Sequence, residues 1–218
     1  MIDYEVVINN KCHGGCSWCS ATGKGINYRG LSESWKSVLK KIEKPKSILI
    51  GGKGEPTEHP EFPEFLQLLY ESGISVSYKT NGVILGTPGD PRAEELLKIS
   101  KDFCVGVSIT LGNKELSRYW GKAISALLET GVKITLLYTI SDQPSLDFLK
   151  TTIERYPDLN HLVFPKLDLN QKFDVDKEVM KSEILNSENV TFDPERPKAI
   201  FLRSKRQLIT KNIFEIKY

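Results

Sequence analysis

The segment KSILIGGKGEPTEHPEFPEFLQLLYESGISVSYKTNG, residues 46–82, changes its hydrophobic period twice. Residues 46–52 form a short apolar run that ends in glycines, which is typical of a buried strand. Residues 60–73 carry apolar side chains at helical spacing and end at a glycine, and residues 74–82 return to a strand pattern. A strand, a helix and a second strand in this order predict a parallel βαβ unit.

The same alternation continues on both sides of this segment. We expect further strands at residues 4–10, 102–110, 132–140 and 161–167, and further helices at residues 32–44, 91–100, 114–131 and 144–157. Ser32 is the expected N-cap of the first helix. Six alternations predict an α/β protein with a parallel sheet, either an open doubly wound sheet or a partial (βα)6 barrel, since a complete eight-unit barrel needs about 250 residues.

The pattern breaks up after residue 167. We therefore expect a core domain over residues 1–167 and a C-terminal extension over 168–218, with one helix (176–186) and two short strands (199–203 and 207–216). The extension is basic from about residue 195, with seven Lys/Arg and two Glu, whereas the residues before it hold 23 Lys/Arg and 26 Asp/Glu. One interpretation of such a basic run is a docking surface for nucleic acid or for an acidic partner. The commoner role of such a run is a solvent-exposed face of the protein.

The overall composition is that of a globular protein. Of the 218 residues, 39% are hydrophobic and 27% are charged, which is enough apolar material for a core. The first residues, MIDYEVVINN, lack the basic and apolar regions of a secretory signal, and no apolar run approaches the roughly 18–20 residues that cross a bilayer. We expect a cytoplasmic protein that does not enter a membrane, in which clustered cysteines bind metal more often than they pair.

Three of the four cysteines lie in the loop after the first strand, NNKCHGGCSWCSATGKG (residues 9–25). Cys12, Cys16 and Cys19 have the spacing C-x3-C-x2-C, at the strand end where parallel α/β proteins bind ligands. A structural zinc ion would need a fourth ligand, from among His13, His59, His161 and Cys104. A redox C-x-x-C motif would leave Cys12 unused. Three thiolates suit a [4Fe–4S] cluster with one open iron.

Three motifs in order resemble those of the radical S-adenosylmethionine (SAM) superfamily. CHGGCSWC matches its three-cysteine signature, with Trp18 in the aromatic position. GGKGEPTEHPEF is similar to its Gly-Gly-Glu-Pro motif after the second strand, although Lys53 and Gly54 interrupt the commoner form, and YKTNG resembles its third-strand motif. The resemblance spans residue 4 to about 167, and it implies a partial (βα)6 TIM-like barrel with a short C-terminal extension.

The resemblance also implies a ligand set. Cys12, Cys16 and Cys19 would hold three irons of a [4Fe–4S] cluster, and the methionine part of SAM would chelate the fourth. Glu55 would accept a hydrogen bond from the ammonium group of SAM. The further residues expected to contact the cofactor are Trp18, Gly52, Gly54, Pro56, Asn81 and Ser108.

The implied reaction is reductive cleavage of SAM by an oxygen-sensitive cluster, followed by hydrogen abstraction from a substrate. The electron would come from a reductant such as flavodoxin or ferredoxin. Tyr138 and Lys79 are candidate catalytic groups, although core packing and a surface amine are the commoner roles of such residues. The substrate remains open among small molecules, nucleotides, peptides and macromolecules. One alternative is an activase of a glycyl-radical enzyme, and another is a non-catalytic Fe–S or zinc protein.

Overall fold

A computed structural model describes residues 2–16, 27, 29–40, 43–51, 54–112, 114–140, 143–165, 190–192, 198–201 and 209–211. The strands are β1 (Tyr4–Val7), β2 (Ser47–Ile50), β3 (Ser75–Thr80), β4 (Cys104–Leu111), β5 (Ile134–Ile140), β6 (Asn160–Pro165), β7 (Val190–Phe192), β8 (Lys198–Phe201) and β9 (Ile209–Lys211). The α-helices are α1 (Leu31–Leu39), α2 (Phe62–Glu71), α3 (Pro91–Phe103), α4 (Ser117–Thr130) and α5 (Gln143–Arg155), and two 3-10 turns are η1 (Pro56–Glu58) and η2 (Lys114–Leu116).

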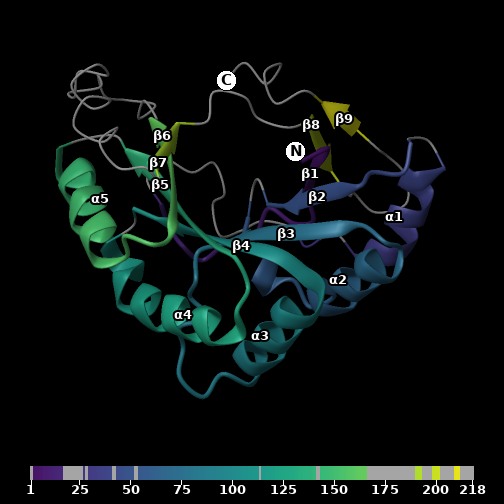
Figure 1. Cartoon of the computed structure of the whole chain (residues 1–218). Coiled ribbons are helices and arrows are strands. Elements are labelled where there is room, and N and C mark those ends of the chain that lie inside the picture. Colours follow the sequence, from purple (N-terminus) through teal and green to yellow (C-terminus); the bar gives the residue numbers. More distant parts are fainter. Residues whose placement is uncertain are drawn as a thin grey trace.

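The strands form one curved sheet in the order β7-β6-β5-β4-β3-β2-β1-β8-β9, with the helices α1–α5 along one side of it (Figure 1). Every pairing is parallel except that of β8 with β9. The predicted α/β fold with six parallel strands is confirmed, and the sheet does not close into a barrel. Within the described residues, no helix is both long and apolar enough to span a membrane.

The C-terminal extension contributes to both ends of the sheet. β8 pairs in parallel with β1, and β9 follows it. β9 lies inside the predicted strand 207–216, and β8 begins one residue before the predicted strand 199–203. β7, which pairs with β6, was not predicted. The predicted helix at 176–186 lies outside the described residues, and the boundary at residue 167 stays a prediction.

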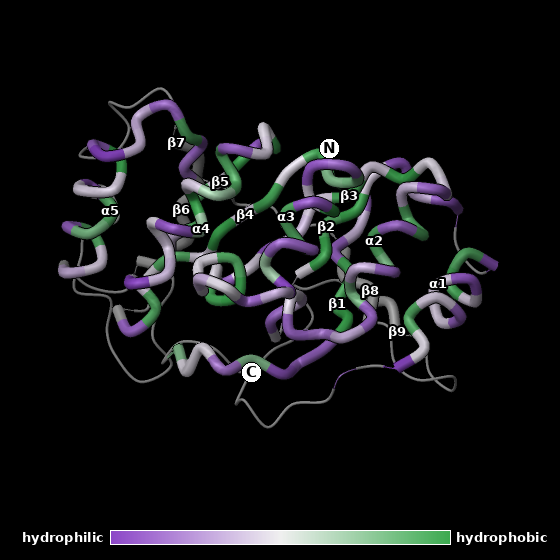
Figure 2. Tube along the Cα trace, turned by 90° about the horizontal axis from the view of Figure 1, so that it is seen from below, coloured by the Kyte–Doolittle hydropathy of each residue, from purple (hydrophilic) through white to green (hydrophobic). Residues whose placement is uncertain are grey.

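The two faces of the sheet differ in polarity. The core cluster contains Val6, Ile50 and Tyr78 from the strands, together with apolar residues of the helices. Tyr78, for example, meets the ring of Phe62 edge-on at 5.2 Å between centroids. Figure 2 shows largely apolar strands beside helices that alternate between apolar and polar residues. Because side chains alternate across a strand, the neighbours of these core residues point to the opposite face, which we call the inner face.

The start of α1 differs from the prediction. Gly30, with φ 67°, precedes the helix, and Ser32 lies within it, so the predicted N-cap is wrong. The carboxylate of Glu61 instead accepts hydrogen bonds from the backbone N–H groups of Gly30 (3.1 Å) and Leu31 (2.8 Å). A cap from a residue 30 positions away has no local sequence signal, which explains the error.

Candidate functional site

The loops after β1 and β2 meet through the backbone. The N–H of Glu55 donates to the carbonyl of Lys11 at 2.8 Å. In return, the side-chain Nδ2 of Asn9 donates to the carbonyl of Glu55, also at 2.8 Å. These bonds hold the segment of Glu55, the residue predicted to bind the ammonium group of SAM, against the segment that leads into the cysteine loop.

Glu55 is a buried carboxylate, with only 3% of the residue exposed. Its Oε1 accepts hydrogen bonds from the N–H (3.1 Å) and the hydroxyl (2.7 Å) of Thr57. Its Oε2 accepts one from the N–H of Asn81 at 2.6 Å. Burial raises the pKa of Glu55 above its ordinary value, and these hydrogen bonds oppose that shift without cancelling it.

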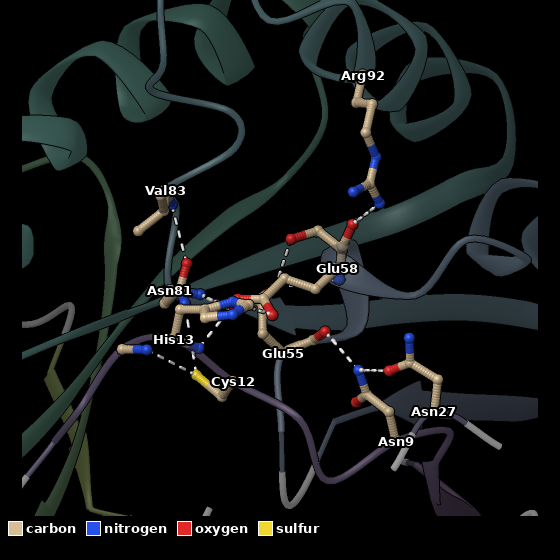
Figure 3. Close-up of polar contacts among 11 residues, drawn as sticks. Asn9, Cys12, His13, Asn27, Glu55, Glu58, Asn81, Val83 and Arg92 are labelled. Atoms are coloured by element: carbon tan, nitrogen blue, oxygen red, sulfur yellow. Dashed lines mark hydrogen bonds and ion pairs between the residues drawn. The ribbon is translucent and has the colours of Figure 1, made fainter. Parts of the chain in front are cut away.

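Asn81 links this carboxylate to the cysteine loop (Figure 3). Besides its backbone bond to Glu55, its Nδ2 lies 3.7 Å from the Sγ of Cys12. The indole N–H of Trp120 donates to the carbonyl of Asn81 at 3.2 Å. The side-chain Oδ1 of Asn81 accepts from the N–H of Val83 at 2.9 Å. The ends of β1, β2 and β3 are thereby joined by polar contacts of one asparagine.

Cys12 and Cys16 are partly buried thiols in the first loop. The Sγ of Cys12 accepts from the N–H of Gly14 at 3.3 Å, and the Sγ of Cys16 lies 4.0 Å from the Gly14 carbonyl. Burial raises the pKa of Cys12 to about 12, so without metal its thiol is protonated at neutral pH. Cys19 and Trp18 lie outside the described residues.

Gly54 is required by close packing of these two loops. Its φ is +84°, and a Cβ built on it would lie 2.6 Å from Oδ1 of Asn9 and 2.9 Å from the backbone of Asn10. That Oδ1 is buried and has no hydrogen-bond partner among the described residues. Pro56, which follows Glu55, is buried at the start of η1. Gly52, another predicted cofactor residue, lies outside the described residues.

A second carboxylate, which sequence reasoning missed, fastens the cysteine loop. Glu58 in η1 accepts from the backbone N–H of His13 at 3.2 Å through Oε1 and lies 2.8 Å from the ring Nδ1 of His13 through Oε2. The His13 side chain is 69% exposed, whereas that of Glu58 is 13% exposed. On the far side of η1, the guanidinium of Arg92 donates to the Thr57 carbonyl. The spacing of Glu58 from Glu55 was the one available signal.

The other predicted site residues fall on different faces. Lys79 forms an ion pair with Glu5 at 2.8 Å on the inner face, and Ser108, half-buried, is its register partner on β4. Tyr138 instead belongs to the core, where its hydroxyl lies 3.1 Å from Nδ1 of His161. The structure therefore brings Lys79 and Ser108 together and places Tyr138 away from them.

The donor set fits a cluster with an open iron. Within the described residues, which include Cys12 and Cys16 but not Cys19, no group of three His, Cys, Asp or Glu side chains is placed to hold a metal ion. Cys104 belongs to β4 and packs against the core. Cys12 and Cys16 are thiol donors of the kind that hold an Fe–S cluster, and the buried carboxylate of Glu55 lies in the adjoining loop.

Comparison with known proteins shows the family. The model of the radical SAM superfamily matches residues 6–142. A 7-carboxy-7-deazaguanine synthase from Aquifex aeolicus is 30% identical over 111 residues, which are 50% of this chain and 45% of that protein. The chain thus spans less than half the length of this curated relative.

Solved structures show the same fold. SuiB from Streptococcus suis, bound to S-adenosylmethionine, matches with a TM-score of 0.63 and 16% identity, over 89% of this chain and 51% of that one. A radical SAM methyltransferase from Sphaerobacter thermophilus matches with a TM-score of 0.56 and 16% identity, over 87% and 66% of the two chains. The likeness confirms the partial-barrel fold that the motifs implied.

Proposed function

Because this chain belongs to the radical SAM superfamily, we propose that it is an enzyme that cleaves S-adenosylmethionine reductively and abstracts hydrogen from a substrate at the inner face of its sheet. Cys12, Cys16 and Cys19 are the proposed ligands of a [4Fe–4S] cluster. Glu55 is the proposed acceptor for the ammonium group of SAM, with Gly52, Gly54, Pro56, Asn81, Ser108 and Trp18 as the other contacts.

The observation that carries the proposal is the contact chain from Glu55 through Asn81 to Cys12. Asn81 donates its N–H to the carboxylate and its side-chain amide to the sulfur. A residue that touches both groups fixes the distance between a cation acceptor and a metal ligand. A non-catalytic Fe–S carrier or a zinc clip would have no use for that coupling.

When bound, the cluster supplies the electron that splits SAM into methionine and a 5′-deoxyadenosyl radical. The residues of this chain orient the reactants and keep water away. Burial raises the pKa of Glu55 and so favours its neutral form, whereas a bound ammonium group would favour the carboxylate. Cofactor binding is therefore expected to ionise this side chain. A flavodoxin or ferredoxin as electron donor, and a cytoplasmic location for an oxygen-sensitive cluster, belong to the same proposal.

The test begins with anaerobic reconstitution with iron and sulfide, reduction by dithionite and chromatographic detection of 5′-deoxyadenosine. We expect the product from the wild type and no product from Cys16→Ala. Cys104→Ala removes a thiol of the core and is the matched control, with product formation retained. Equal product from the wild type and Cys16→Ala would contradict the ligand assignment, and a loaded wild type that neither binds nor cleaves SAM would contradict the proposed function.

A second variant tests the cofactor contact. We expect Glu55→Gln to retain the iron content of the wild type and to bind SAM at least roughly tenfold more weakly, because a hydrogen bond to a charged group is lost. Equilibrium dialysis of SAM against the loaded proteins measures the difference. Unchanged affinity for SAM in a variant with normal iron content would contradict the assignment of Glu55 as the acceptor for the ammonium group.

A further inference from the structure

Glu5 and Lys79 are the only charged residues in strands β1–β5. They lie on β1 and β3, with β2 between them, and their charged atoms are 2.8 Å apart. The side chain of Glu5 is 4% exposed and that of Lys79 is 27% exposed. Charges in a sheet lose solvation, and apolar residues of similar size pack at least as well. The fold itself therefore gives no reason for this pair.

The backbone beneath the pair is shaped for it. A Cβ on Gly51, directly after β2, would lie 2.9 Å from Cδ of Lys79 and 3.2 Å from Oε1 of Glu5. With a larger residue at position 51, the side chain of Lys79 would have to shift from its present position. The glycine lets Lys79 lie along the inner face and reach the carboxylate of Glu5.

The ammonium group of Lys79 has spare donors. It carries three N–H groups, and among the described residues Glu5 is its one hydrogen-bond partner. Ser108, half-buried on the neighbouring strand, is in register with Lys79. Asn81, which contacts both Cys12 and Glu55, follows two positions along the chain. The spare donors thus lie on the inner face, close to the proposed SAM contacts.

We propose that Lys79, held in place by Glu5, binds a carboxylate group of the substrate from which hydrogen is abstracted. This inference rests on the proposed function. An ammonium group and a neighbouring hydroxyl can both donate hydrogen bonds to a carboxylate, and the ammonium adds an opposite charge. SAM also carries a carboxylate, but the family resemblance assigns that group to the open iron. The substrate is the source that remains for the site at Lys79.

The experiment uses the cluster-loaded protein with saturating SAM under anaerobic conditions. Glutarate is the probe and its neutral diamide, glutaramide, is the comparison ligand, with binding followed by saturation-transfer NMR. We expect glutarate but not glutaramide to bind the wild type. Lys79→Met weakens glutarate binding at least roughly tenfold, since a charge-assisted hydrogen bond is lost. Lys98→Met, an exposed lysine on α3, leaves it unchanged.

A substitution of Glu5 tests the proposal independently, because we expect it to change glutarate affinity in the opposite direction. Glu5→Gln removes the negative charge beside the ammonium, so glutarate binding becomes roughly threefold tighter or more. The double variant Glu5→Gln/Lys79→Met leaves no unpaired buried charge, and it separates lost binding from lost folding. No glutarate binding to the wild type, or equal binding in the double variant, overturns the proposal.

A parallel measurement of SAM affinity distinguishes the two carboxylate sources. If Lys79→Met weakens SAM binding and leaves glutarate binding intact, the ammonium serves the cofactor and the substrate proposal is overturned. Unchanged SAM affinity together with lost glutarate binding supports it. A wild type that takes up no cluster or SAM contradicts the proposed function instead, so the two failures are distinguishable.

Discussion

At the scale of single residues, Glu55 combines burial with three hydrogen-bond donors, which leave its carboxylate further acceptor capacity. Thr57 and Asn81 direct three polar groups at its two oxygens. The carboxylate is therefore held in one orientation before any cofactor arrives, and the ordering cost is met during folding rather than on binding. The same burial raises its pKa, which has a measurable effect on stability.

We expect the apo protein to become less stable as pH rises above the ordinary pKa of a glutamate. The unfolded chain ionises Glu55 near the ordinary glutamate pKa of 4.5, whereas the folded chain keeps it protonated to higher pH. Between these two pKa values unfolding releases a proton, and the contribution of Glu55 to the free energy of unfolding falls by about 1.4 kcal/mol per pH unit.

Urea denaturation of the reduced apo protein at a series of pH values from about 5 to 8 measures this effect. Glu55→Gln cannot ionise, so its stability lacks this part of the decline. Parallel curves for the wild type and the variant would show that the pKa of Glu55 is the same in the folded and the unfolded chain.

At the scale of elements, the turn η1 joins the segment of Glu55 to the cysteine loop. Glu55 precedes it, and Glu58 at its end fastens His13 next to the first cysteine. Arg92, from α3, donates to the Thr57 carbonyl in the same turn. A three-residue turn thus ties α3, the carboxylate of Glu55 and the cysteine loop together.

We expect Glu58→Ala to release iron to a chelator several times faster than the wild type, because the loop loses both of its bonds to η1. Glu58→Gln retains an oxygen acceptor for the N–H of His13 and should fall between the two. Absorbance of the reconstituted cluster during incubation with a chelator follows the loss. Equal rates of iron release from Glu58→Ala and the wild type would mean that the contacts of Glu58 with His13 do not hold the cysteine loop.

The elements with local sequence signals could be predicted, and those that depend on distant partners could not. Hydrophobic period and glycine positions indicated the strands β1–β6 and the helices α1–α5. The three-residue strand β7 has no pattern of its own because its pairing with β6 defines it. Likewise Glu55 and Cys12 came from motifs, whereas the contact of Lys79 with Glu5 spans 74 positions and has no motif.

At the scale of the whole molecule, the sheet is completed from the C-terminal side. β1 lies between β2 and β8, with Tyr4 opposite Ile48 on one side and Lys198 on the other. Without β8, β1 would be an edge strand with unpaired backbone groups, next to the loop that carries the cysteines. Edge strands of this kind favour association between chains.

We expect a chain that ends after Pro165 to unfold at lower temperature and to self-associate, because β1 loses its outer partner. A chain that ends after Lys211 retains β8 and β9 and serves as the control. Thermal melting followed by circular dichroism, together with light scattering, measures both effects. A melting temperature and scattering equal to those of the control would show that β8 contributes nothing to the sheet.

The pairing of β1 with β8 also bears on how the chain is made. β8 follows β1 in the sequence only after β2–β7, so the strand that leads into the cysteine loop waits for its second neighbour until all of those strands have been synthesised. Contacts over such a sequence separation form slowly, since a long loop must close first. We expect the nascent chain to hold an immature cysteine loop until then, so that metal loading follows the synthesis of β8.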